Sequence, residues 1–274
     1  MKRIGNLYEK ICSIENLQLA DEKARKGKLR TYGVLEHDKN REANLLKLRE
    51  TLLNGTFHTS KYDVFTIYEP KEREIYRLPY FPDRILHHAI MNVLEPIWVS
   101  TFTADTYSCI KNRGIHAAAK KVKQALREDP EGTTFCLKLD IRKFYPSINH
   151  DVLKSILRRK LKDKRLLRLL DEIIDSADGV PIGNYLSQYF ANLYLTYFDH
   201  WIKEQKRVKH YFRYADDIVI LASDKSYLHS LMGEIRAYLG DLKLEVKGNW
   251  QVFPVAARGI DFVGYVFFHT PTPK

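Results

Sequence analysis

The segment FCLKLDIRKFYPSI, residues 135–148, decides the fold of this chain. Its first residues alternate so that Phe135, Leu137 and Leu139 share one face, which is the period of two of a β-strand. Asp140 follows near the end of this run. The segment therefore predicts a core strand that delivers a carboxylate at its end.

A second segment, RYADDIVIL, places two adjacent aspartates between short β-prone runs. The runs His210–Arg213 and Ile218–Ala222 flank Asp216 and Asp217, which predicts the tip of a hairpin. An isolated Asp-Asp pair is more often only a turn, because aspartate is favoured there. Together with Asp140, however, the pair forms a set of three carboxylates at strand ends.

Carboxylates on neighbouring strands suit nucleotidyl transfer. This reaction needs cations that neutralise charge on the attacking and leaving oxygens, commonly two metal ions about 4 Å apart. Mg²⁺ prefers carboxylate oxygen, and such ligands accept Mn²⁺ as well. The pattern predicts a two-metal site that uses two Mg²⁺ ions, with Mn²⁺ as a substitute.

Length and composition indicate a globular protein that meets a polyanion. The chain has 274 residues, 45% of them hydrophobic and 29% charged, with a formal net charge of +11 and a pI of about 9.4. Nucleic acid is the commonest polyanion available to such a surface. The alternative is a basic protein without a polyanionic partner.

The cysteines and the hydropathy pattern bear on the compartment. Three cysteines without a CxxC pair favour neither a disulfide framework nor a zinc site, which indicates a reducing environment. No stretch approaches the roughly 18 apolar residues that span a bilayer. We expect a cytoplasmic protein with no membrane partner.

The remaining periodicities predict a mixed α+β chain. Residues 1–55 are typical of helices broken around Gly27 by a basic run, which is either a solvated helix face or a phosphate contact. The other expected elements are a strand pair over 62–80, helices over 85–97, 115–126, 151–176, 184–202 and 227–239, and strands over 242–247 and 260–268.

At this point the chain resembles the reverse transcriptases. FCLKLDIRKFYPSI is similar to the family's motif A, RYADDIVIL to motif C, and RGIDFVGYVF to motif E, which holds the primer end. The resemblance implies an α+β right-hand polymerase with fingers and palm, an antiparallel palm sheet backed by helices, and a short or absent thumb. It implies an N-terminal helical extension over 1–60, fingers over 61–134, a palm over 135–255, and a primer grip with truncated thumb over 256–274.

The resemblance also implies roles for individual residues. Asp140 and Asp216 are the expected metal ligands, with an oxygen from the Ile141 carbonyl and with Asp217 completing the cluster. Tyr145 matches the aromatic residue that closes the sugar pocket against a 2′-hydroxyl, and its alternative role is that of a core tyrosine. The further contacts expected with nucleotide or nucleic acid are Phe144, Gly183, Gln188, Lys111, Arg113, Tyr214, Gly264 and Tyr265.

Two basic segments are expected to reach the triphosphate. EPKEREIYRLPYFPDR resembles the fingers motif, in which Arg73 is the best candidate and Lys71 and Arg77 are weaker ones. Each is alternatively a surface charge of a strand. Lys247 falls near the motif D lysine, a general acid for pyrophosphate, although Lys243 is an equally basic neighbour.

Motif B suggests which kind of reverse transcriptase this is. Ile182 stands where many members have glutamine, and Ile-Gly-x-x-x-Ser-Gln resembles the enzymes of diversity-generating retroelements. So do NLYEKICSIENLQLA, TYSCIKNRGIHAAA and GNWQVFPVAARGIDFVGY. An isoleucine donates no hydrogen bond, so base-pair geometry should be checked less strictly. The alternative is that Ile182 only packs against the helix start.

This resemblance implies partners and leaves alternatives. The expected partners are a template RNA, a DNA or RNA primer with the cDNA, dNTPs and a basic accessory variability protein. The alternatives are a reverse transcriptase of antiviral defence or of group II intron type, or a non-catalytic RNA-binding scaffold. Three mutually repelling carboxylates argue against the scaffold, because without a metal they serve no purpose.

Overall fold

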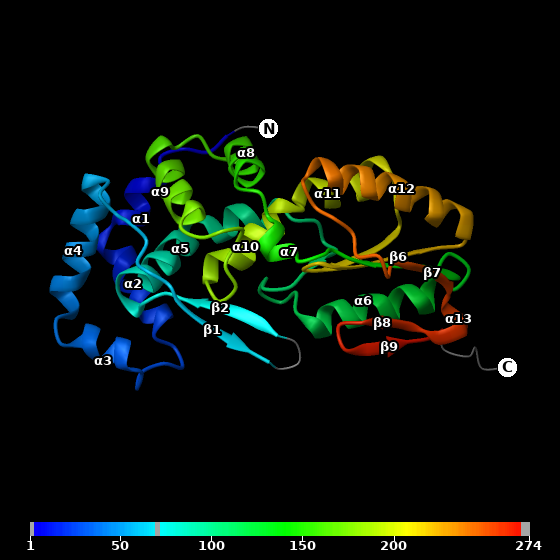
Figure 1. Cartoon of the computed structure of the whole chain (residues 1–274), viewed down its shortest axis with the longest axis horizontal. Coiled ribbons are helices and arrows are strands. Elements are labelled where there is room, and N and C mark those ends of the chain that lie inside the picture. The colour runs from blue at the N-terminus through cyan, green and yellow to red at the C-terminus, as the bar shows by residue number, and fades with distance from the viewer. Residues whose placement is uncertain (1–2, 69–71, 270–274) are drawn as a thin grey trace. The chain divides into compact units, whose positions relative to one another are not determined.

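The chain divides into two compact units. A computed structural model describes residues 3–68 and 72–269, and Figure 1 labels the elements. The first unit consists of Met1–Ser100 and His150–Leu193, and the second of Thr101–Asn149 and Tyr194–Lys274. The four-part division into extension, fingers, palm and grip stays a prediction.

The N-terminal part of the first unit is helical, as predicted. Its elements are α1 (Tyr8–Cys12), α2 (Ile14–Ala24), α3 (Tyr32–Asp38) and α4 (Arg41–Asn54). The helices break at Gly27, whose φ of 69° lies in the left-handed region that glycine tolerates best. Within the basic run, Arg25 forms ion pairs with Asp21 and Asp38. Part of this run therefore holds α2 and α3 together.

A hairpin and further helices complete the first unit. Strands β1 (Asp63–Ile67) and β2 (Arg73–Arg77) pair antiparallel, which confirms the predicted strand pair. The helical elements that follow are η1 (Tyr80–Arg84), α5 (Ile85–Val99), α8 (His150–Lys160), α9 (Lys164–Asp175) and α10 (Tyr185–Tyr194). Helix α5 packs along α2 and buries most of its apolar side chains.

The second unit is built on a five-stranded sheet in the order β3-β5-β6-β4-β7, in which β3 runs parallel to β5 and the other neighbours are antiparallel. The strands are β3 (Thr106–Tyr107), β4 (Phe135–Asp140), β5 (His210–Tyr214), β6 (Asp217–Ala222) and β7 (Gln251–Pro254). Figure 1 shows helices α6 (Ile115–Glu128) and α12 (Lys225–Asp241) on opposite faces of this sheet.

The face towards α6 carries the core that matters for the site. Cys136 and Val219 on this face pack with Ala118 and Val122 of α6. Because side chains alternate along a strand, the face that holds Cys136 is also the face of Lys138 and Asp140. The remaining elements of this unit are α7 (Phe144–Ser147), α11 (Thr196–His200), η2 (Trp201–Gln205), α13 (Val255–Arg258), β8 (Ile260–Phe262) and β9 (Tyr265–Phe267).

The single long helix predicted over 184–202 is wrong. The chain forms α10, α11 and η2 in succession, and Leu195 leaves the helical region with φ −97° and ψ 2°. The two sides of the break have different buried partners. The Tyr194 hydroxyl donates to the carbonyl of Leu242, at 2.5 Å, whereas Asp199 meets the side chains of β5. A continuous stripe cannot serve both sets of contacts.

The last predicted strands also need correction. Residues 242–247 form no strand, because Lys243 has a φ of 61° and only Val246 bridges to Ile141. The edge position beside β4 belongs instead to β7, which the sequence did not reveal. The run over 260–268 is two strands, since Val263 and Gly264 turn the chain with positive φ.

Two further observations concern the expected compartment. Within the described ranges, no helix is both long and apolar enough to cross a membrane. Cys12, Cys109 and Cys136 are all free thiols. The expectation of a cytoplasmic protein stays a prediction.

Candidate active site

The sheet register brings the three predicted carboxylates together. Asp140 at the end of β4 lies opposite Asp217 at the start of β6. Asp216 sits in the turn of the β5–β6 hairpin, after Ala215 with its φ of 54°. The amide of Ile141 donates to the Asp216 carbonyl at 3.2 Å, which ties the turn to the end of β4. The predicted hairpin tip is confirmed.

A buried ion pair supports this hairpin from inside the protein. Arg213 and Asp199 are both fully buried, and the guanidinium donates to the two carboxylate oxygens at 2.8 and 2.6 Å. The Tyr211 hydroxyl donates to the same carboxylate at 2.5 Å. The Arg213 side chain also donates to the Ala215 carbonyl at 2.9 Å, so it fixes the backbone next to Asp216. Removing one partner of such a pair typically costs about 3–5 kcal/mol.

Burial and mutual repulsion perturb the carboxylates. Burial raises the pKa of Asp216 to about 6, and the nearby charge of Asp140 adds to this effect. Burial likewise raises the pKa of Asp217, against the opposing influence of Lys138. Both shifts show that additional negative charge is unfavourable here. The site therefore favours binding of a cation.

Two lysines already offset part of this charge. Lys247 Nζ lies 2.5 Å from Asp140 Oδ1, and Lys138 forms an ion pair with Asp217. Lys138 also lies over the ring of Phe262 on β8, with its Nζ 5.2 Å from the ring centroid. Lys138 was not predicted as a site residue, although its position two residues before Asp140 on a strand puts both side chains on the same face.

The donor set fits a divalent cation by its chemistry. Asp140 at the end of β4 and Asp216 in the neighbouring hairpin turn offer carboxylate oxygens, as Mg²⁺ prefers. Asp140 Oδ1 is buried and makes no hydrogen bond despite its ion pair with Lys247. As the side chains stand, no group of three His, Cys, Asp or Glu residues in the described part of the chain is gathered to hold a metal. Metal ligation by Asp140, Ile141, Asp216 and Asp217 stays a prediction.

Tyr145 lies near the carboxylates in the same unit. It belongs to α7, and Lys143, the residue before this helix, has a φ of 43°. Burial raises the pKa of Tyr145 well above its usual range, and the charges of Cys109 and Asp216 add to this. Phe144 is buried and packs edge-on against the Tyr145 ring with centroids 5.6 Å apart. Phe144 therefore supports the position of Tyr145.

Other predicted contacts lie in the loops and hairpins of the second unit. Lys111 is exposed, whereas the Arg113 side chain donates to the Thr103 carbonyl at 2.8 Å and so stabilises its own loop. Tyr214 ends β5 opposite Asp217. Their contacts with nucleic acid stay predictions.

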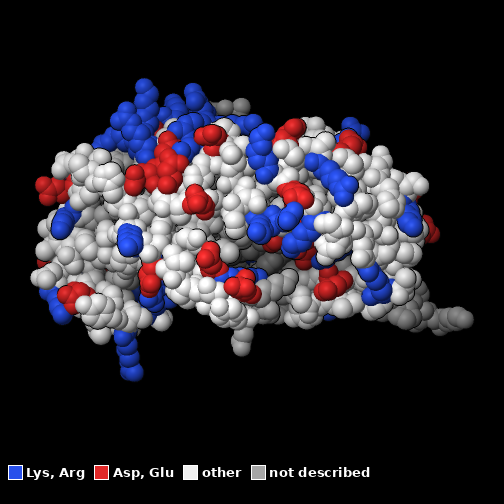
Figure 2. All heavy atoms as spheres, viewed as in Figure 1, with Lys and Arg blue, Asp and Glu red and all other residues white. Residues whose placement is uncertain are grey.

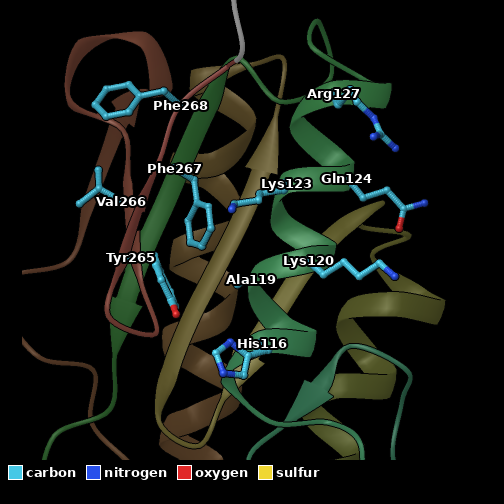
Figure 3. A pocket seen from close by; sticks show the side chains of 10 residues that line it. All are labelled: His116, Ala119, Lys120, Lys123, Gln124, Arg127, Tyr265, Val266, Phe267 and Phe268. Carbon is cyan, nitrogen blue, oxygen red and sulfur yellow. The ribbon is translucent and has the colours of Figure 1, made fainter.

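A groove between α6 and β9 combines cations with aromatic rings. Its volume is about 960 Å³. Figure 3 shows the basic side chains extending from α6 and the rings of Tyr265 and Phe267 extending from β9 towards the helix. Tyr265 is 44% exposed and follows Gly264, which turns the hairpin with φ 83°. Such a combination suits a single nucleic-acid strand. The residues of the groove that carry this chemistry are His116, Lys120, Lys123, Arg127, Tyr265 and Phe268.

The first unit brings motif B against the β1–β2 hairpin. The Tyr76 amide donates to the Ile182 carbonyl at 2.8 Å. Gly183 has a φ of 117°, and a Cβ there would meet the Tyr76 carbonyl at 2.9 Å, so this contact requires glycine. Ile182 is partly buried, while Gln188 is exposed on α10. The motif B loop is thus fixed to strand β2.

Two of the predicted phosphate-binding residues, Arg73 and Arg77, lie on the same strand. Arg77 forms an ion pair with Asp63 and lies over the Phe65 ring, 5.5 Å from its centroid. Arg73 is exposed at the start of β2 and has no ion pair among the described residues. Lys71 lies outside the described residues. Of the two described residues, Arg73 is therefore better placed than Arg77 for an incoming anion.

The fold is that of a reverse-transcriptase-like α+β protein. It is similar to telomerase from Candida tropicalis in complex with a fragment of telomeric RNA, with a TM-score of 0.55 at 13% identity over 76% of this chain and 43% of that chain. The apo telomerase truncated from its C-terminal domain gives a TM-score of 0.51 at 12% identity, over 72% of this chain and 50% of that one.

Sequence comparison defines the family. The family described as reverse transcriptase (RNA-dependent DNA polymerase) matches residues 69–267, which is more than half of the sequence, and the chain belongs to it. Its members are RNA-directed DNA polymerases, and the chain is an enzyme of this class.

Individual relatives cover the chain to different extents. Protein YkfC of Escherichia coli is 26% identical over 80% of this chain and 69% of its own length. The group II intron-encoded protein LtrA of Lactococcus lactis is 24% identical over 64% of this chain but only 31% of its own length. Nuclear intron maturase 4 of Arabidopsis thaliana is 27% identical over 56% of this chain and 20% of its length.

The Lys247–Asp140 ion pair leads to a first testable prediction. In Lys247→Met the ammonium no longer competes for Asp140, so Mn²⁺ should bind roughly tenfold more tightly, equivalent to about 1.4 kcal/mol. Isothermal titration calorimetry measures this affinity. The matched control is Lys243→Met, an exposed neighbour, which should change affinity less than about twofold. Unchanged or weaker Mn²⁺ binding by Lys247→Met would contradict the competition.

Proposed function

We propose that the chain copies an RNA template into cDNA by two-metal nucleotidyl transfer at Asp140, Asp216 and Asp217. The observation that carries this proposal is the register that opposes Asp140 to Asp217 with Asp216 in the adjoining turn. The raised pKa of Asp216, caused by burial and by Asp140, supports it, because a divalent cation relieves such repulsion.

The metals would be held by Asp140 and Asp216, with Asp217 and the Ile141 carbonyl nearby, and Mg²⁺ or Mn²⁺ would neutralise charge on the reacting oxygens. The chain's own residues have separate tasks. Tyr145 closes the sugar pocket, and Arg73 binds the triphosphate. Lys247 holds the proton at Nζ that the leaving pyrophosphate accepts. Before a metal binds, its ion pair with Asp140 holds this ammonium beside the carboxylates.

The architecture we propose follows from these tasks. The sheet of the second unit is the palm, and the β8–β9 hairpin with Gly264 and Tyr265 grips the primer. The β1–β2 hairpin, together with motif B, is part of the fingers. The groove between α6 and β9 adds cations and rings that suit a nucleic-acid strand.

We further propose that the chain is the low-fidelity reverse transcriptase of a diversity-generating retroelement. Its errors opposite template adenines would introduce mutations into a target gene. The support for this proposal is Ile182 in motif B. The side chain there has no hydrogen-bond donor for a nucleotide or a template base, so discrimination rests on shape alone. Its partners would be a template RNA, a primer, dNTPs and a basic accessory protein.

A second candidate function is a reverse transcriptase of group II intron type. It is favoured by the similarity to LtrA and to nuclear intron maturase 4. The Ile-Gly-x-x-x-Ser-Gln pattern that begins at Ile182 favours the retroelement instead. Gene neighbourhood separates the two, because a diversifying element lies beside near-identical repeats that differ at adenines.

Replacing Asp216 tests the proposed chemistry. Asp216→Asn keeps the size of the side chain but removes the charge, so extension of a primer on an RNA template with Mg²⁺ should slow at least about a hundredfold. Asp241→Asn, at the exposed end of α12, serves as the control and should retain activity within about twofold. Equal extension by Asp216→Asn and the wild type would remove the proposal.

Replacing Ile182 tests the proposed infidelity. Ile182→Gln restores an amide that can hydrogen-bond a nucleotide, so misincorporation opposite template adenines should fall roughly tenfold, or about 1.4 kcal/mol of discrimination. Sequencing of cDNA made on an adenine-containing template measures it. Ile182→Val is the control for packing and should keep the wild-type error spectrum. An unchanged spectrum in Ile182→Gln would contradict the role of Ile182.

A further inference from the structure

A dense basic surface lies on α8 and α9 of the first unit. Between Lys154 and Arg168 the sequence contains eight Lys or Arg residues and one acidic residue, Asp163. Figure 2 shows Lys and Arg side chains gathered over these two helices. Neither the family motifs nor the proposed chemistry uses this surface.

The only acidic residue within this run does not pair with its cations. Asp163 caps the start of α9, where one carboxylate oxygen accepts from the Leu166 amide at 3.3 Å. The other oxygen accepts from the amides of Leu7 and Tyr8 at 2.8 and 2.9 Å. Its hydrogen-bonding capacity is therefore directed to backbone groups.

Three of the cations have structural partners outside the run. Lys154 and Arg158 form ion pairs with acidic residues of α9. Arg165 pairs with Glu9 at 2.7 Å and lies over the Tyr8 ring at 4.4 Å. These three side chains hold helices together, so they are poor candidates for ligand contact.

Three other cations are exposed and form no ion pair with any described residue: Lys162, Lys164 and Arg168. Lys164 and Arg168 are four residues apart on α9 and thus share a face. Arg168 also lines a hollow of about 430 Å³ together with His58 and Arg165. These cations are available to a polyanion.

This surface differs from the α6–β9 groove in one decisive way. The groove presents exposed aromatic rings, whereas none of the exposed large hydrophobic residues of the described chain falls between Lys154 and Arg168. The run from Lys154 to Arg168 thus offers charged groups that contact phosphates and no exposed apolar ring of its own on which an unpaired base would stack. The expected ligand is therefore a double helix held by its backbone.

We propose that Lys162, Lys164 and Arg168 bind the sugar-phosphate backbone of double-helical RNA. The chain belongs to a family of RNA-dependent DNA polymerases, and an RNA chain forms double helices where its segments are complementary. Double-stranded RNA is recognised through its shape and phosphates, largely independently of sequence. The surface would hold a folded template RNA by such a helix.

The experiment measures binding of an RNA dumbbell, a duplex closed by a loop at each end, which offers no primer end to the carboxylates. The test variant is Lys162→Glu/Lys164→Glu/Arg168→Glu. The matched control is Lys47→Glu/Arg49→Glu/Lys225→Glu, which changes the net charge equally at exposed positions elsewhere. The test variant should bind at least about tenfold more weakly at 0.15 M salt, and the control should stay within about threefold.

The salt dependence identifies the contacts. Each lost phosphate contact should reduce the magnitude of the slope of log affinity against log salt concentration by about 0.9. The slope of the test variant should therefore be smaller in magnitude than that of the wild type by about two to three. In Lys162→Gln/Lys164→Gln, which removes charge without reversing it, the magnitude of this slope should fall by about two. Lys162→Arg/Lys164→Arg should retain the wild-type slope.

Other outcomes would overturn the proposal. Equal weakening of the test and control variants would mean a general effect of net charge, and tighter binding of a DNA dumbbell of the same sequence would exclude RNA as the specific ligand. Extension of a short primer–template by the test variant should stay within about twofold of wild type. The binding result is therefore independent of the proposed chemistry at Asp216.

Discussion

Repulsion among the carboxylates of Asp140, Asp216 and Asp217 is the constraint that the surrounding residues of the second unit must offset. The pairing of β4 with β6 forces two of them to face each other, and burial in the turn raises the pKa of Asp216 to about 6. The protein offsets this cost in two ways. Lys138 and Lys247 pair with the carboxylates directly, and the buried Arg213–Asp199 pair anchors the hairpin backbone beneath them. An arrangement of this kind is strained without cations, which is why it is informative about function.

Local patterns predicted the parts of the site that depend on local sequence. The alternation before Asp140 and the two β-prone runs around Asp216 predicted β4 and the β5–β6 hairpin. This was possible because the period of a strand is visible in consecutive residues. The identity of the edge strand was not predictable in this way. Strand β7 pairs with β4 across more than a hundred residues, and the run predicted as a strand turns at Lys243 instead. The break at Leu195 likewise could not be predicted locally, because the residues on its two sides contact buried partners that are distant in sequence.

The same distinction holds for single residues. The aspartates were predicted as metal ligands because carboxylates at the ends of neighbouring strands indicate metal chemistry. Lys138 was missed because a lysine on a strand usually faces solvent, and only the pairing of β4 with β6 gives it Asp217 as a partner. For Gly183 the requirement comes from a close approach to the Tyr76 carbonyl, a contact between distant segments.

The surfaces of the two units suggest different ways of holding nucleic acid. Rings and cations occur together in the α6–β9 groove, as an unpaired strand requires, whereas α8 and α9 present cations alone. A polymerase that copies a folded RNA meets both forms of its template. The two surfaces would allow the enzyme to hold a helical segment and an unpaired strand of nucleic acid at the same time.

Anomalous diffraction from crystals grown with Mn²⁺, primer–template and a non-reacting nucleotide tests the central claim most directly. We expect anomalous density at the carboxylates of Asp140 and Asp216, with Lys247 displaced from Asp140, and loss of this density in Asp216→Asn. Mn²⁺ bound elsewhere, with the Lys247–Asp140 and Lys138–Asp217 pairs unchanged, would contradict the account.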